Sequence, residues 1–236
     1  MRTQDQIERL QRTHSEPIQF QKIVSNEQIE ELKNYYYNSK EVIQKNTGPR
    51  VLYIDDHPFI ETITQYLQQY YLPFKVRSAH IFEVNKPHVV HIDDDFKYPD
   101  IYKGFVIPLE TIGAPCDRAK FVVFDQYYYD GPAKFFNGEE KDFTETYYNE
   151  SITDYTNVHG TVNKEFPKHL KVTLLNHLKS EWLQGLSINA YFPWTIGSVI
   201  SFDSSALHSA SDFNRAGITK KLGLSIFTEL DNGTSD

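Results

Sequence analysis

The spacing of apolar residues changes near Phe74, from a helical period to the alternation typical of strands. Before Phe74, Ser25 and Gln28 form a capping box that predicts a helix, and Pro58 stands in the first turn of a second helix. The expected helices cover residues 25–38, 58–70 and 167–184; the expected strands cover 20–24, 51–54, 75–84, 88–93, 104–109, 120–125, 186–191, 198–202 and 221–228, with a short strand at His208. This order predicts a mainly β fold with flanking helices, a β-sandwich or jelly roll with the N-terminal helices packed outside.

The length and composition of the chain fit one large β-rich domain, since 236 residues with 39% hydrophobic content can bury a sizeable core. We expect the jelly-roll core at residues 75–230 and an N-terminal helical flank at residues 1–74, whose first 16 residues are frayed or weakly helical. Residues 126–168 show no sustained period but hold many aromatic side chains, which argues against disorder. They are expected to form a long insertion that acts as a lid or binding loop.

A histidine and an aspartate occupy alternate positions of one predicted strand, at His91 and Asp93. Alternate side chains of a strand point to the same face, so this pair can bind one metal ion. More than a hundred residues later, a hairpin pattern that begins at Gly197 brings His208 back to the sheet. Two histidines and one carboxylate leave half of an octahedral coordination sphere open, which is the ligand set of non-heme Fe(II) oxygenases.

Simpler interpretations exist for each residue of this motif. His91 and Asp93 could be a surface pair at a strand end, and His208 could be a packed core histidine. His88 is expected on the opposite face of the strand, as a structural residue. The next two residues of the acidic run, at positions 94 and 95, are expected to be solvated, with a weak Ca²⁺ site as the alternative.

The His91-x-Asp93 motif and the distal His208, which follows the strand from Gly197 to Asp203, resemble the Fe(II)/2-oxoglutarate-dependent dioxygenases. The Ile107-Pro108-Leu109 strand is most similar to their phytanoyl-CoA-hydroxylase-like branch. The resemblance covers roughly residues 75–230 and implies a double-stranded β-helix, Fe(II) bound by His91, Asp93 and His208, and 2-oxoglutarate and O2 as cosubstrates. It also implies hydroxylation, because halogenating relatives carry Gly or Ala in place of Asp93.

The residue expected to bind the distal carboxylate of 2-oxoglutarate is a lysine. The family pattern commonly has an arginine beyond the distal histidine, but here Lys220 and Lys221 occupy that region and Arg215 falls in an earlier turn. On a strand, Lys221 shares its face with Gly223 and Ser225, whereas Lys220 shares its face with apolar residues. A buried carboxylate needs a cation and hydrogen-bond donors, so we assign it to Lys221, with Ser225 as a helper and Lys220 or Arg215 as alternatives.

Charge and cysteine content narrow the class of protein further. A net charge of −8 argues against a nucleic-acid-binding surface, and the single cysteine, Cys116, excludes internal disulfides and suits a reducing cytoplasm. No apolar run could span a bilayer, so we expect a cytoplasmic protein with no membrane partner. The acidic charge is compatible with a small-molecule or amino-acid-like substrate, and we expect no nucleic-acid partner. Two other classes stay open: a cupin-like non-oxidative metalloenzyme and a catalytically silent jelly-roll binding module.

Overall fold

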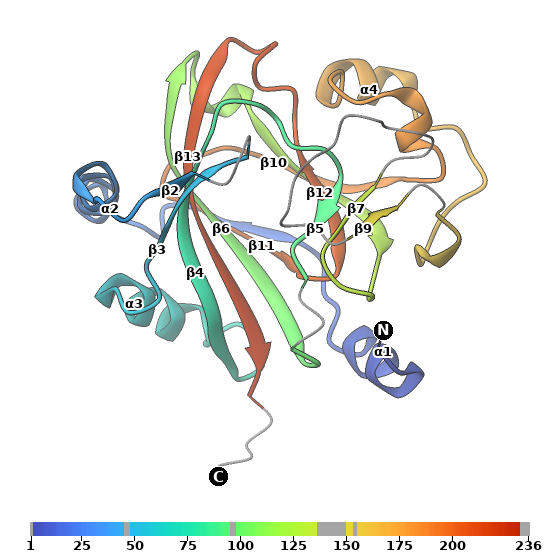
Figure 1. Ribbon diagram of the computed structural model, residues 1–236, viewed down its shortest axis with the longest axis horizontal. Helices are drawn as coiled ribbons and strands as arrows, with labels where there is room; N and C mark the ends of the chain where they lie inside the picture. Colours follow the sequence, from blue (N-terminus) through green and yellow to red (C-terminus); the bar gives the residue numbers. More distant parts are fainter. Residues whose placement is uncertain (1, 45–47, 95–97, 136–149, 153–154, 232–236) are drawn as a thin grey trace.

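Two β-sheets face each other across the core of the protein (Figure 1). The structure is a computed structural model that describes residues 2–44, 48–94, 98–135, 150–152 and 155–231. The seven-stranded sheet has the order β1 (Ile18–Phe20), β11 (Val199–Asp203), β6 (Ile101–Gly113), β13 (Ile218–Leu230), β4 (Phe74–Val84), β3 (Arg50–Tyr53) and β2 (Ile43–Gln44). The six-stranded sheet has the order β10 (Ile188–Pro193), β7 (Lys120–Tyr127), β12 (Ala206–Ala210), β5 (His91–Ile92), β8 (Ala133–Phe135) and β9 (Glu150–Ile152). The expected mainly β, jelly-roll fold is confirmed.

The register of β13 decides which of its side chains face the second sheet. This strand pairs with β4 on one side and with β6 on the other, so Lys221 stands opposite Val84 and Ser225 stands opposite His80. The alternate residues Leu222, Leu224 and Ile226 join the hydrophobic cluster beneath the helices. One face of β13 therefore packs outward against helices, and the other face, with Lys221 and Ser225, points toward the space between the sheets.

Two helices cover the outer face of the seven-stranded sheet, as expected for the N-terminal part of the chain (Figure 1). Helix α2 (Asn26–Asn38) begins with the predicted capping box between Ser25 and Gln28, and α3 (Pro58–Leu67) has its proline in the first turn. Ile29 of α2 and Ile63 of α3 are buried in the cluster that includes Leu224. The same part of the chain also supplies β1, β2 and β3 to the sheet.

The first 16 residues were expected to be frayed or weakly helical, and the structure places a helix among them. Helix α1 (Gln4–Gln11) begins with a capping box between Thr3 and Gln6, a pattern that is visible in the sequence. Leu10 is buried in a small cluster with Ile101 and Tyr129. This contact fixes the helix against the end of the sandwich, where a short isolated helix would otherwise be marginal.

The helix expected at residues 167–184 is interrupted. Helix α4 (Lys168–Leu174) ends where the Leu174 carbonyl accepts a hydrogen bond from the backbone amide of Asp212 at 2.7 Å, and the 3-10 turn η3 (Ser180–Leu183) follows. Leu178 and Trp182 are nevertheless buried in the same cluster as Leu174, so the apolar stripe was identified correctly. Two further 3-10 turns are η1 (Cys116–Arg118) and η2 (Tyr155–Asn157).

Part of the predicted insertion at residues 126–168 is described. It contributes β8, β9 and η2, and Tyr128 and Phe135 are buried in the cluster beneath α4. Residues 136–149 and 153–154 lie outside the described ranges, so the expectation of a lid is not tested there. Within the described ranges, no helix is both long enough and apolar enough to cross a membrane.

Candidate metal centre and adjoining cavity

His91, Asp93 and His208 lie together between the two sheets. His91 on β5 pairs directly with His208 on β12, and Asp93 follows β5 by one residue. The Nε2 atom of His208 lies 3.3 Å from Oδ2 of Asp93, and the Nε2 atom of His91 lies 3.8 Å from the same oxygen. One ligand atom from each residue lies within 4.8 Å of the other two. The expected strand at 88–93 is only two residues long, but the expected convergence of the three side chains occurs.

The two imidazoles are oriented by backbone carbonyls. Nδ1 of His91 lies 2.7 Å from the carbonyl oxygen of Val89, and Nδ1 of His208 lies 3.1 Å from that of Ala206. With Nδ1 as the donor to the carbonyl oxygen, each ring presents Nε2 toward Asp93 as the atom available to a metal. This is the tautomer that metal-binding histidines adopt when a second group orients the ring.

The protonation states of His91 and Asp93 suit a divalent cation. Burial lowers the pKa of His91 well below its ordinary value, and the nearby His208 and His88 lower it further. Burial alone would raise the pKa of the Asp93 carboxyl, but His91 and His208 outweigh that effect and hold the pKa well below its usual range. The result is an ionised carboxylate beside a neutral imidazole, which a metal ion can bind without first displacing protons.

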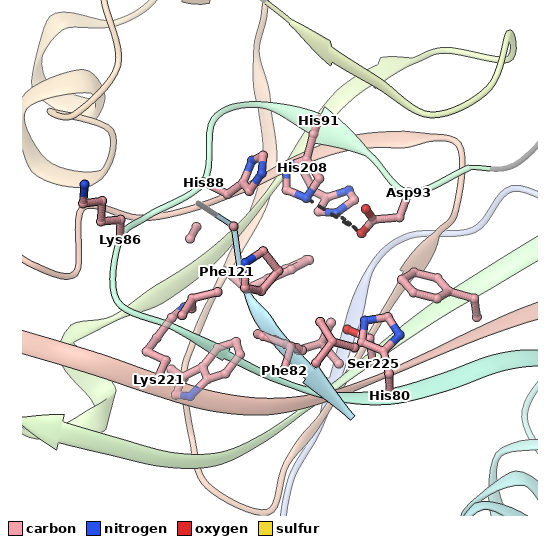
Figure 2. A pocket seen from close by; sticks show the side chains of 18 of the residues that line it. His80, Phe82, Lys86, His88, His91, Asp93, Phe121, His208, Lys221 and Ser225 are labelled. Carbon is pink, nitrogen blue, oxygen red and sulfur yellow. Dashed lines mark hydrogen bonds and ion pairs between the residues drawn. The ribbon is translucent and has the colours of Figure 1, made fainter. Parts of the chain in front are cut away.

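A cavity of about 430 Å³ extends from these three residues toward the opposite sheet (Figure 2). Much of its wall is aromatic and comes from both sheets: Phe82, Phe121, Trp194 and Phe227. Lys221 and Ser225 line it from β13, across from the histidines and Asp93. A cavity of this size, apolar with a few convergent polar groups, is typical of a small-molecule site.

Lys221 is the buried cation of this cavity. Its residue is 2% exposed, and its Nζ atom lies 3.9 Å from the ring centroid of Trp194 and 4.8 Å from that of Phe213. Among the described residues, no carboxylate pairs with it. Burial lowers the pKa of Lys221 to about 7. Such a group is costly to keep charged until an anion enters the cavity.

The alternatives to Lys221 lie elsewhere. Lys220 points to the outer face, where its Nζ atom lies 3.0 Å from Glu83 and 3.2 Å from the hydroxyl of Tyr37. Arg215 lies in an exposed turn and donates to the Val172 carbonyl at 2.8 Å. The structure therefore brings Lys221 and Ser225 to the cavity, and it does not bring Lys220 or Arg215 there.

Two expectations for the residues around the motif are wrong. His88 does not point away, because its ring centroid lies 4.4 Å from that of His91 and its side chain lines the cavity; residues 87–90 are not in a strand, so alternation does not apply to them. Asp94 is not solvated but 0% exposed, and the guanidinium of Arg2 binds it. Asp95 lies outside the described residues.

Sequence reasoning also missed His80, which the fold brings to the site. His80 lines the cavity from β4, and Arg77 of the same strand donates to the backbone carbonyl of Asp93 at 3.3 Å. For His80 there was a signal, since it shares a strand face with Phe82 and Val84. A break in the register between β4 and β13 falls at Arg77.

The fold resembles that of several solved structures, although no family model matches the sequence and no curated protein sequence matches it. One is the non-heme α-ketoglutarate-dependent carbocyclase SnoK from nogalamycin biosynthesis (12% identity, TM-score 0.50, 97% of this chain and 84% of that chain). Another is a prolyl-4-hydroxylase of Pseudomonas putida (12% identity, TM-score 0.51, 94% and 95%). A third is HygX from Streptomyces hygroscopicus with nickel, 2-oxoglutarate and hygromycin B bound (10% identity, TM-score 0.50, 98% and 88%). At such low identity the likeness establishes the jelly-roll fold.

Proposed function

We propose that the protein is an Fe(II)- and 2-oxoglutarate-dependent oxygenase that hydroxylates an unactivated C–H bond of a small-molecule or amino-acid-like substrate. One observation carries the proposal: His91, Asp93 and His208 line one wall of a cavity whose opposite wall holds the buried Lys221. The first group can hold a metal with open positions, and the second can bind the far carboxylate of a dicarboxylic acid. The solved structures with this fold include proteins described as dependent on α-ketoglutarate, or bound to 2-oxoglutarate, which supports the same conclusion.

Each residue has a defined task in this proposal. His91, Asp93 and His208 hold Fe(II) through two Nε2 atoms and one carboxylate, which is a ligand set that fits the metal. Lys221 binds the distal carboxylate of 2-oxoglutarate as a point charge, and the Ser225 hydroxyl donates to it. When bound, the iron, the keto acid and O2 supply the oxidising chemistry, as cofactors commonly do for reactions that side chains cannot perform.

The cavity walls exclude water and position the substrate. Phe82, Phe121 and Trp194 surround the space between Lys221 and the histidines, so a bound carboxylate meets Lys221 in an environment of low dielectric. With about 430 Å³ available, the cosubstrate and a small substrate fit together. The phytanoyl-CoA-hydroxylase-like branch and the cytoplasmic location are part of the proposal and rest on the sequence alone.

The test is anaerobic loading of the purified protein with Fe(II), followed by addition of 2-oxoglutarate and O2. We expect bound iron and slow formation of succinate even without the true substrate. His91→Ala and Asp93→Ala should abolish both while circular dichroism stays unchanged. Succinate formation by either variant would refute the proposal.

The same experiment distinguishes the two alternatives. A bound metal without turnover of 2-oxoglutarate would favour a cupin-like non-oxidative metalloenzyme. A chain that binds neither metal nor keto acid would be a silent jelly-roll binding module.

A further inference from the structure

Arg2 joins the first residues of the chain to the segment that carries Asp93. Its side chain is 2% exposed; Nη1 lies in close contact with Oδ2 of Asp94, and Nη2 donates to Oδ1 of Asp94 at 2.9 Å. The same guanidinium donates to the backbone carbonyls of Tyr129 at 2.6 Å and Tyr98 at 2.9 Å. One side chain therefore links three separate segments, and its carboxylate partner is the residue directly after Asp93.

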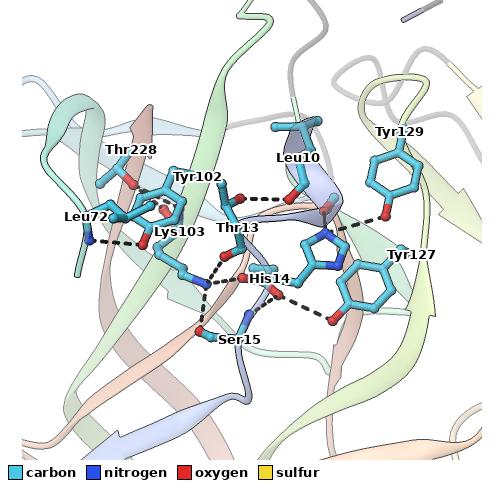
Figure 3. A network of polar contacts seen from close by, with 12 residues as sticks. Leu10, Thr13, His14, Ser15, Leu72, Tyr102, Lys103, Tyr127, Tyr129 and Thr228 are labelled. Atoms are coloured by element: carbon cyan, nitrogen blue, oxygen red, sulfur yellow. Dashed lines mark hydrogen bonds and ion pairs between the residues drawn. The ribbon is translucent and has the colours of Figure 1, made fainter. Parts of the chain in front are cut away.

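The far end of these first residues, at Ser15, lies beside Lys103 (Figure 3) and contacts Asp203, which precedes the turn that leads to His208. The Ser15 amide donates to Asp203 at 3.2 Å, and Lys103, which forms a buried ion pair with Asp203, also donates to the Ser15 hydroxyl at 2.8 Å. Asp203 is the last residue of β11, and the turn after it leads into β12 with His208. Residues 2–16, which we call the N-terminal arm, thus touch both segments that supply metal ligands.

Between these two ends, side chains of the arm pack against the rest of the protein. The His14 ring stacks on the ring of Tyr127, with a centroid distance of 4.0 Å, and lies 6.1 Å from that of Tyr129 (Figure 3). Leu10 is 2% exposed. Movement of the arm would therefore disturb the contacts of Arg2 at one end and of Ser15 at the other.

We propose that the N-terminal arm holds the metal ligands in place and that Arg2 is the positioning residue for Asp93. The inference rests on the proposed function only in that His91, Asp93 and His208 bind a divalent metal. Arg2 fixes the Asp94 carboxylate by a two-pronged contact in a dry environment, which restricts the backbone of the adjacent Asp93. Groups behind metal ligands typically change metal affinity about 10- to 100-fold when removed, which sets the expected size of the effect.

The experiment measures Mn(II) and Co(II) binding to the apo-protein by calorimetry and by the Co(II) electronic spectrum. Arg2→Gln should weaken binding about 10- to 100-fold and alter the Co(II) spectrum, and Arg2→Lys should restore part of the affinity. Arg9→Gln is the matched control, because Arg9 lies in the same N-terminal arm, on α1, and its side chain is 48% exposed in its ion pair with Asp100. It should leave affinity and spectrum unchanged.

A second measurement uses the unaltered protein, so that poor folding of a variant cannot obscure the result. If the packing of the arm strengthens metal binding, then bound metal must stabilise the packed arm by the same free energy. Mn(II) should therefore slow hydrogen exchange of the backbone amides in residues 2–16. Wild-type affinity in Arg2→Gln, or exchange in the arm that is unchanged by bound Mn(II), would overturn the inference; failure of the wild-type protein to bind any divalent metal would instead refute the proposed function.

Discussion

Replacing Lys221 by methionine should increase the stability of the empty protein while it weakens cosubstrate binding. Burial lowers the pKa of Lys221 from 10.5 to about 7, a difference of about 3.5 pH units. At about 1.4 kcal/mol per pH unit, charging this lysine in the folded protein costs about 5 kcal/mol, which we take as an upper limit. Methionine has a similar length and carries no charge, so Lys221→Met removes this cost and keeps the contact with Trp194.

The sign of the pH dependence follows from the lowered pKa. Between about pH 7 and pH 10.5 the unfolded chain binds a proton that the folded chain lacks, so the stability of the wild type rises with pH across that window. Below about pH 7 both states are protonated and the full cost applies. The advantage of Lys221→Met, measured by urea unfolding, should therefore be largest near pH 6 and shrink toward pH 10.

The effect on cosubstrate binding has the opposite direction. Removing one partner of a buried charge pair costs about 2–5 kcal/mol, which corresponds to roughly 30- to 5000-fold weaker binding of 2-oxoglutarate. In the wild type at pH 8, about nine in ten empty sites hold a neutral lysine, so binding should take up close to one proton; at pH 6 the uptake should be near zero.

Calorimetry in buffers of different ionisation enthalpy measures both affinity and proton uptake. Lys220→Met is the control, because Lys220 pairs with Glu83 on the outer face and should change neither quantity. Unchanged affinity in Lys221→Met, together with no proton uptake by the wild type at pH 8, would show that Lys221 does not bind the carboxylate.

Three further predictions concern the metal ligands and the packing around them. His91→Ala and Asp93→Ala should each abolish Mn(II) binding, because two ligands are too few for a stable site; tight binding by either variant in calorimetry would contradict this. His88→Ala should retain Mn(II) binding within a few-fold, since its ring lies beside His91 but outside the group of ligands; complete loss would make His88 a fourth ligand. Gly104→Ala should destabilise the fold by about 1–3 kcal/mol in urea, because the added Cβ would lie 2.6 Å from Cζ of Phe202; unchanged stability would mean that this ring moves freely.

Much of the site could be predicted because it depends on local patterns. The alternation of strand residues separated Lys221 from Lys220. The hairpin expected before His208 is wrong, because β11 and β12 belong to different sheets, but the short turn between them does bring His208 beside His91. Capping-box residues marked the start of α2 in the same way. These features are decided by neighbours in the sequence, so a single chain reveals them.

The contacts that were missed depend on residues far apart in the chain. Arg2 and Asp94 are 92 positions apart, and nothing near either residue indicates that the other neutralises it. The end of α4 likewise depends on the amide of Asp212, which the local sequence around Leu174 does not reveal. An acidic run looks solvated unless its partner is known, and an apolar stripe looks continuous unless the element that interrupts it is known.

The metal ligands and Lys221 belong to different sheets, β5 and β12 on one side and β13 on the other. In the proposed complex, the keto acid spans the gap between them, so the separation of the two layers determines which chain length of dicarboxylic acid reaches both ends. A shorter acid such as oxaloacetate would leave one contact unmade. Side chains that hold the layers apart therefore take part in choosing the cosubstrate without touching its carboxylates. Phe121 is one of them, and its ring centroid lies 5.4 Å from that of His208.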